Sequence, residues 1–119
     1  MNILIVEKST EIRERIKKIL SSLNIKTKSY NSTTIREAIN LAEEHKPEVL
    51  ITDIDLVDGS GLSLISFIQK VSPKTKIIVY TQRISSKLKQ ICLKMGADYF
   101  LSKSADIKNM KKIINVFSK

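Results

Sequence analysis

The sequence predicts an α/β fold in which five parallel strands alternate with five helices. Short runs of aliphatic residues recur along the chain, and stretches with apolar residues at helical spacing lie between them. Strands that are apolar at every position are typical of parallel sheets, which helices cover on both faces. The length of 119 residues suits one domain, 1–119, and is too short for an eightfold barrel. A doubly wound open sheet therefore remains.

The first quarter of the chain predicts a strand, a helix and a second strand. Residues 3–6 are all aliphatic and indicate a strand buried on both faces. Ser or Thr at 9–10 can cap the helix that follows, whose apolar residues recur every three or four positions. Residues 25–30 alternate with lysines, which indicates a more exposed strand.

The second quarter repeats this order and leads into a turn. Ser or Thr at 32–33 opens a second helix, and Pro47 ends that region because a helix tolerates proline poorly beyond its first turn. Residues 49–52 form another buried strand. The Asp-Gly-Ser-Gly segment at 58–61 predicts a turn before a third helix, which has its apolar stripe at 62–68.

The second half predicts two more strands, each followed by a helix. Residues 76–81 form the fourth strand, and the apolar face of the fourth helix runs from 84 to 95. Gly96 is well placed to stop that helix. Residues 99–101 form the fifth strand, and Ser104 is expected to cap the last helix.

Polar residues follow the ends of these predicted strands. Ligands of open parallel sheets bind beyond the carboxyl ends of the strands, near the point where strand order reverses. Carboxylates, a hydroxyl and ammonium groups gathered there could bind a divalent cation and a phosphoryl group. The candidate site residues are Glu7, Lys8, Asp53, Asp55, Thr81 and Lys103.

Four segments of the chain carry a further signal, and they are residues 3–7, 50–62, 79–81 and 96–103. Each segment alone is weakly specific, but all four fall at strand ends. Together and in this order they resemble the response-regulator receiver domain of two-component signalling, and the resemblance covers essentially the whole chain. It implies a flavodoxin-like sheet with strand order 2-1-3-4-5.

The resemblance implies that Asp53 accepts a phosphoryl group from a phosphohistidine on a histidine kinase or phosphotransferase, in a phosphorelay. Glu7 matches the first residue of an acidic pair that binds Mg²⁺, together with Asp53. Asp55 matches the position whose backbone carbonyl ligates that ion. A domain of this kind is a signalling module rather than an enzyme, and it acts by binding a downstream protein.

The resemblance also implies how the phosphorylated state is read. Thr81 matches the hydroxyl that turns toward the phosphoryl group, and Lys103 matches the lysine that pairs with it. Phe100 matches the aromatic residue whose rotamer reports the switch, although a static core role is as consistent with the sequence. The change would reach a partner through the face made by the fourth helix, fifth strand and fifth helix.

Lys8 is the main departure from the family pattern, because it stands where a second, metal-binding acidic residue is usual. An ammonium cannot ligate Mg²⁺ and repels it. Two interpretations stay open. Either Lys8 points away and Glu7 with Asp53 holds a weak Mg²⁺, or Lys8 reaches Asp53 and replaces the metal. The second would make the chain a pseudo-receiver, an interaction module that works without phosphorylation.

The formal net charge of +9 raises the question of a polyanionic partner. The basic residues are predicted on helix surfaces, with no helix-turn-helix and no aromatic stacking platform. Contact with nucleic acid or a membrane surface is therefore the minor alternative, and docking onto an acidic protein is favoured. The single cysteine and the lack of a signal peptide predict a cytoplasmic protein. A homodimer is compatible with the sequence.

Overall fold

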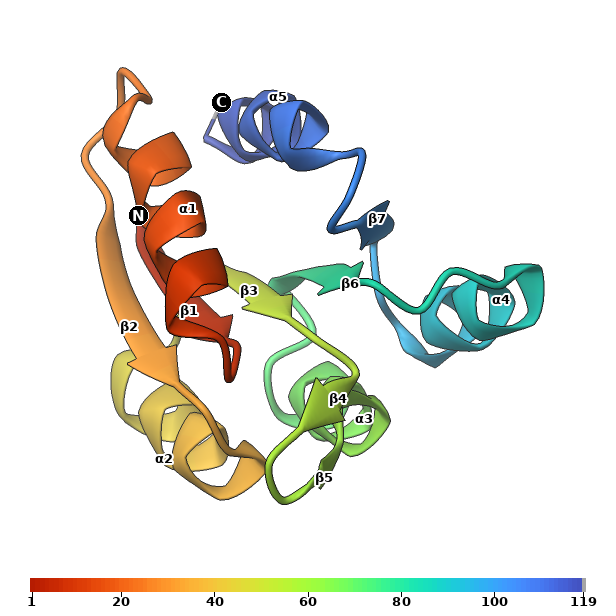
Figure 1. Ribbon diagram of the computed structural model, residues 1–119. Helices are drawn as coiled ribbons and strands as arrows, with labels where there is room; N and C mark the ends of the chain where they lie inside the picture. Colours follow the sequence, from red (N-terminus) through yellow and green to blue (C-terminus); the bar gives the residue numbers. More distant parts are fainter. Residues whose placement is uncertain (119) are drawn as a thin grey trace.

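The computed structural model describes residues 1–118. Strands and helices alternate as predicted, and a small additional hairpin follows the third strand (Figure 1). The strands are β1 (Asn2–Val6), β2 (Lys28–Ser32), β3 (Val49–Thr52), β4 (Asp55–Leu56), β5 (Gly59–Ser60), β6 (Lys76–Thr81) and β7 (Tyr99–Ser102). The helices are α1 (Thr10–Ser21), α2 (Ile35–His45), α3 (Gly61–Val71), α4 (Ser86–Met95) and α5 (Ile107–Phe117).

The main sheet is parallel, has five strands and follows the order β2-β1-β3-β6-β7. Counted along this sheet, the order is the predicted 2-1-3-4-5. Helices α1 and α5 cover one face and contact each other, while α2, α3 and α4 cover the other face (Figure 1). The doubly wound, flavodoxin-like prediction is therefore confirmed.

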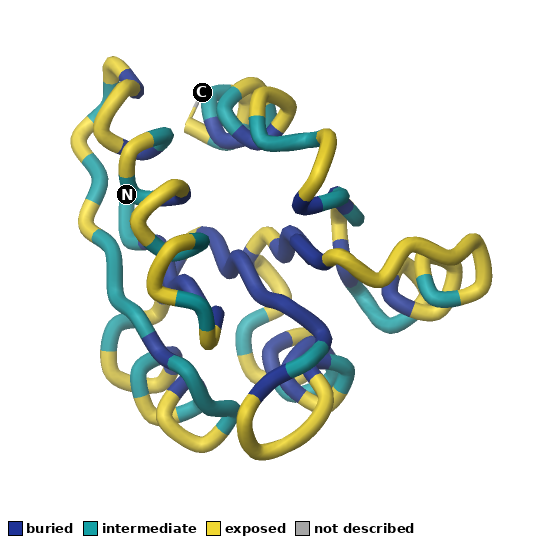
Figure 2. The backbone as a smooth tube through the Cα atoms, in the orientation of Figure 1, coloured by how far each residue is buried: buried dark blue, intermediate teal, exposed yellow. Residues whose placement is uncertain are grey.

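The central strands are mainly apolar because their side chains alternate between two separate cores. Leu4 and Val6 pack with the α2–α3–α4 core, whereas Ile3 and Ile5 pack with the α1–α5 core. Strands β3 and β6 alternate in the same way, and the exposed residues lie mainly on the outer helix surfaces and connecting loops (Figure 2). Burial on both faces thus explains the aliphatic runs that indicate the sheet.

Strand β2 differs from its prediction, since it begins at Lys28 and not at residue 25. Its register is set by pairing of Lys28–Ser32 with the whole of β1. Ile25 packs against the α1–α5 core but precedes the paired segment. The cap of α2 is also displaced. Thr34 caps it by accepting from the Glu37 N–H, because residue 32 still belongs to the strand.

The start and inner face of α4 differ from the prediction. This helix begins at Ser86, so Ile84 lies in the preceding loop and is 61% exposed. Ile91 is also exposed, and Cys92 is the fully buried residue of the helix. The prediction that Ser104 caps α5 is also wrong. Asp106 precedes that helix, and its carboxylate accepts from the Ser102 N–H instead of capping.

The predicted turn at 58–61 is a short hairpin, β4–β5, whose turn also organises α2. The Asp58 carboxylate accepts from the Ile35 and Arg36 N–H groups at 2.7 and 3.1 Å. These hydrogen bonds, the one from Ile35 foremost, lower the pKa of Asp58. The hairpin that follows the third strand is therefore anchored to the amino end of α2.

None of the helices within residues 1–118 has both the length and the apolar character needed to cross a membrane.

Candidate functional site

Backbone pairing continues one residue beyond several strands and sets the position of the site. The Glu7 N–H donates to the Ser32 carbonyl and the Asp53 N–H to the Val6 carbonyl, at 2.9 and 3.1 Å. The Lys103 N–H donates to the Thr81 carbonyl at 2.9 Å. Strand order reverses between β1 and β3, so Glu7 and Asp53 lie at the edge where open parallel sheets bind ligands.

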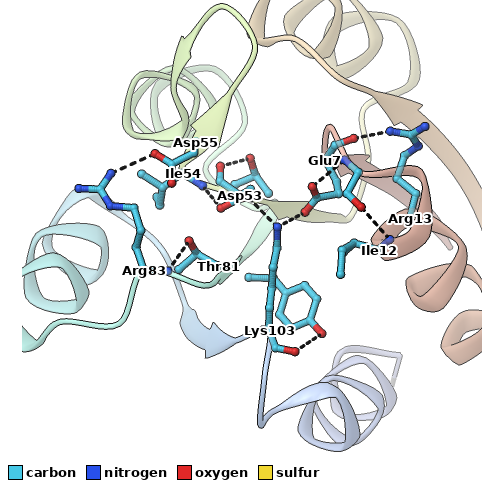
Figure 3. Close-up of polar contacts among 12 residues, drawn as sticks. Glu7, Ile12, Arg13, Asp53, Ile54, Asp55, Thr81, Arg83 and Lys103 are labelled. Carbon is cyan, nitrogen blue, oxygen red and sulfur yellow. Dashed lines mark hydrogen bonds and ion pairs between the residues drawn. The ribbon is translucent and has the colours of Figure 1, made fainter.

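Lys103 joins the two acidic residues at the base of the site. Its Nζ atom lies 2.5 Å from Glu7 Oε1 and 2.6 Å from Asp53 Oδ2 (Figure 3). The three residues are 9% exposed or less. The other two carboxylate oxygens also accept hydrogen bonds, since the Ser9 N–H donates to Glu7 Oε2 and the Ile54 N–H donates to Asp53 Oδ1. The predicted residues thus form a buried and fully partnered ionic cluster.

The charge of Lys103 is maintained by its two acidic partners. Burial by itself lowers the pKa of an ammonium group, but hydrogen bonds and the negative charges of Asp53 and Glu7 outweigh that effect. The pKa of Lys103 is raised above its ordinary value. The ammonium therefore remains protonated at neutral pH beside the Asp53 carboxylate.

A cavity of about 390 Å³ opens above this cluster. Its lining combines acidic groups from the strand ends with basic groups from the loop after β1 and from α1. The lining residues are Glu7, Lys8, Ser9, Glu11, Ile12, Arg15, Asp53, Asp55, Gln82 and Lys103. Of the six candidate residues that follow the strand ends, only Thr81 is outside this lining.

Lys8 lines the cavity, but within residues 1–118 it forms no ion pair or hydrogen bond with Asp53. Its side chain is exposed, and no ion pair involving Lys8 occurs among residues 1–118. The position bridging the two carboxylates belongs to Lys103. The arrangement in which Lys8 reaches Asp53 is therefore absent from the described part of the chain.

Thr81 is fully buried, and its hydroxyl already has a partner. The Oγ1 atom accepts from the Arg83 N–H at 3.2 Å. The Arg83 side chain also pairs with Asp55, at 3.0 Å between Nη1 and Oδ1 (Figure 3). Arg83 therefore links the hydroxyl at the end of β6 to the acidic residue two positions after Asp53.

The Arg83–Asp55 pair is expected to contribute little to folding stability. Both side chains are substantially exposed, and exposed pairs contribute about 0–1 kcal/mol. We expect Arg83→Ala and Asp55→Asn to show a coupling energy of less than about 1 kcal/mol in a double-mutant cycle of urea unfolding. The coupling should shrink further at high salt. A coupling of several kcal/mol would contradict this assignment.

Phe100 lies away from the cavity above Asp53. It is partly buried and packs against the α2–α3–α4 core. It also lines a separate cavity of about 230 Å³, together with Ile84, Lys89 and Asp106, between α4, β7 and the start of α5. The aromatic ring is thus placed at the face through which a partner was expected to bind.

Gly61 supports the site by allowing a close backbone approach. A Cβ atom at this position would lie 2.1 Å from the Asp53 carbonyl oxygen and 3.1 Å from Ile54 Cα. The Gly61 N–H donates to the Ile54 carbonyl at 2.6 Å. The start of α3 therefore packs directly against the backbone of the acidic strand end.

Two arginines of the site lie beyond the sequence-predicted set. The basic residues Arg15 and Arg83 were expected on solvated helix surfaces, but Arg15 lines the cavity and Arg83 precedes α4 and pairs across to Asp55. Arg15 is also close enough to the Tyr80 phenol to oppose the rise in its pKa that burial causes. Helical spacing identifies a polar face, but it does not show what that face lies beside.

The donor set is a poor match for a tight Mg²⁺ site. Both carboxylates are held by Lys103, and Lys8 places a further positive charge in the lining. Across residues 1–118, no group of three or more His, Cys, Asp or Glu side chains is arranged to hold a metal ion. Mg²⁺ prefers an octahedron of oxygen ligands and gives up its water reluctantly.

Comparisons with known proteins point to one family. The sequence profile described as "response regulator receiver domain" matches residues 3–115. The response regulator protein PilR of Pseudomonas aeruginosa is 32% identical, over 93% of this chain and 24% of its own length. The chemotaxis protein CheY of Thermotoga maritima is 27% identical, over 98% of this chain and 97% of its own length.

The fold comparison agrees with the sequence comparison. The beryllofluoride-activated NtrC4 receiver domain, solved as a dimer, matches with a TM-score of 0.88 and 27% identity. The match covers 98% of this chain and 94% of that one. The chain thus spans about a quarter of PilR but nearly all of CheY and of the NtrC4 receiver domain.

Proposed function

Because the chain belongs to the response regulator receiver domain family, we propose that it accepts a phosphoryl group on Asp53 and signals by binding a partner protein. Receiver domains are signalling domains of two-component systems, and the family implies interaction with histidine kinases and downstream effectors. The observation that carries the proposal is the buried contact of the Asp53 carboxylate with Lys103 at the base of an open cavity.

The chain's own residues supply the groups that such a transfer needs. A carboxylate oxygen of Asp53 attacks the phosphorus of a phosphohistidine, and the imidazole nitrogen keeps the electron pair of the broken P–N bond. The product is an acyl phosphate on Asp53. Phosphoryl transfer depends on positioning and on neutralising the charge of the phosphoryl oxygens. Lys103 provides a fixed positive charge 2.6 Å from the attacking Asp53 carboxylate.

Receiver domains generally bind Mg²⁺ at the acidic pocket. For this chain we propose weak or absent binding, with Glu7, Asp53 and the backbone carbonyl of Asp55 as the candidate ligands. Lys103 contacts both carboxylates, and Lys8 supplies another positive charge. None of the steps proposed for Asp53 depends on the ion.

We propose that the phosphorylated state reaches a partner through the face made by α4, β7 and α5. For Thr81 to turn toward a phosphoryl group, its hydroxyl must release the Arg83 N–H, which would free the loop before α4. Phe100 and Ile84 line the 230 Å³ cavity on this face. Exposed lysines on α4 and α5 favour an acidic partner.

The test is phosphorylation by a small phosphodonor such as acetyl phosphate, followed by intact-mass spectrometry. We expect one phosphoryl group on the wild-type chain and none on Asp53→Asn, because an amide oxygen is a poor nucleophile. Glu14→Gln, which removes an exposed carboxylate of α1, is the matched control and should behave as wild type. Lack of any phosphoryl group on the wild type would favour the phosphorylation-independent interaction module.

A further inference from the structure

Lys8 and Arg15 are two cationic residues in the lining of the cavity above Asp53, and they are named here the cationic rim. Both line the 390 Å³ cavity. Lys8 is exposed and lacks an ion pair within residues 1–118. Among residues 1–118, the ion pair of Arg15 is with Glu11, at 3.5 Å between two largely exposed side chains, and it contributes little. The guanidinium also lies near the neutral Tyr80 phenol, which does not cancel its charge. The rim is therefore free to bind an anion that enters the cavity.

The acyl phosphate would create a need for such cations. A phosphoryl group carries roughly −1.5 to −2 charge, which is more than the carboxylate charge that Asp53 loses. Lys103 is shared between Asp53 and Glu7, so it balances only part of that charge. A further positive charge is required in the cavity, and protein side chains or a metal ion could supply it.

The residue at position 8 decides which of these two sources is available. Relative to an aspartate at that position, Lys8 raises the formal charge of the cavity lining by two units. This difference equals the charge of one Mg²⁺ ion. The positive charge of Lys8 also repels a divalent cation from the cavity mouth.

We propose that Lys8 and Arg15, together with Lys103, hold the phosphoryl group on Asp53 as an anion, so that this site accepts it without a divalent cation. This inference rests on the proposed function, since it concerns the same transfer. With acetyl phosphate as donor, an Asp53 oxygen bonds to phosphorus, the donor P–O bond breaks, and acetate leaves with the electron pair. No oxidant or reductant is required.

The experiment compares initial phosphorylation rates in excess Mg²⁺ and in excess chelator, with acetyl phosphate as donor and intact-mass spectrometry as readout. For the wild type we expect the two rates to agree within about threefold, because the cationic rim is present in both conditions. Lys8→Asp should lose about tenfold or more in chelator and recover when Mg²⁺ is added. Arg15→Ala should lose rate in chelator without being rescued by Mg²⁺.

Two variants with the same charge changes serve as controls. Lys26→Asp lies in the exposed loop after α1, and Arg36→Ala lies on the exposed face of α2. Neither residue lines the cavity, so neither variant should alter the rate or its dependence on Mg²⁺. Circular dichroism would verify that Lys8→Asp remains folded, as expected for an exposed position.

Calorimetric titration with Mg²⁺ gives a readout that is independent of phosphorylation. We expect little binding to the wild type and clear binding to Lys8→Asp. Tight binding to the wild type, or wild-type phosphorylation that requires Mg²⁺, would overturn the inference while leaving Asp53 as the phosphoacceptor. Absence of phosphorylation in both conditions would overturn the proposed function together with the inference.

Discussion

Lys103→Met is expected to destabilise the fold by about 3 kcal/mol at neutral pH, because removing one partner of a buried ion pair leaves the opposite charge buried and uncompensated. In this chain two carboxylates, those of Glu7 and Asp53, would lose the same cation. Methionine approximates the length of the lysine side chain and cannot donate to either group. Urea unfolding of wild type and variant measures the difference.

The difference in free energy of unfolding between wild type and Lys103→Met should depend on pH if its cause is electrostatic, and should not if its cause is packing. The pKa of Lys103 is raised in the folded state, so its contribution is complete below the ordinary lysine pKa of about 10.4 and is lost as the pH rises through the higher folded value. The gap between wild type and Lys103→Met should therefore narrow in alkaline solution.

Lys108→Met, at an exposed position of α5, is the control for the loss of a lysine charge. It should change the free energy of unfolding little and without this pH dependence. A gap between wild type and Lys103→Met that stays constant into alkaline solution would contradict the electrostatic account.

Gly61→Ala is expected to destabilise the fold strongly. Its new Cβ atom would meet the Asp53 carbonyl oxygen at 2.1 Å, a distance that backbone atoms cannot accommodate without moving. We expect a loss of about 3 kcal/mol or more in the free energy of unfolding. Because the displaced atoms belong to Asp53, phosphorylation by acetyl phosphate should also slow.

The control for Gly61→Ala is Ser63→Ala, an exposed position in the first turn of the same helix. It tests whether altering the start of α3 is harmful in itself. This control should unfold within about 1 kcal/mol of wild type. Wild-type stability of Gly61→Ala would show that α3 can shift away from the backbone of the acidic strand end.

Several parts of the fold could be predicted because they depend on short-range patterns. The aliphatic runs of β1 and β3 indicate burial on both faces, which a covered parallel sheet provides. Gly96 ends α4 with a positive φ of 121°, as expected of a glycine at a helix end. The predicted start of the edge strand β2 was wrong because its register depends on pairing with β1, a contact distant in sequence.

The residues of the candidate site could likewise be predicted from the sequence only in part. Glu7, Asp53 and Lys103 stand next to predicted strands, so parallel topology alone brings them to one edge of the sheet. The role of Asp58 in anchoring α2 could not be predicted, because it rests on a contact with Ile35, which is 23 residues away in the chain. Likewise, Arg83 reaches Asp55 across 28 residues, and spacing along the chain does not show that contact.

The sequence by itself determined the doubly wound fold class and the identity of the polar residues at the strand ends, because both follow from local periodicity and from where each apolar run stops. The strand order was implied by the resemblance to receiver domains. Only the tertiary structure decided how these charges are shared. Lys103 lies between Glu7 and Asp53, while Lys8 remains exposed and lines the same cavity as Arg15. Electrostatic pairing depends on distance in space, and that distance is set by how the ends of β1, β3 and β7 are placed along one edge of the sheet.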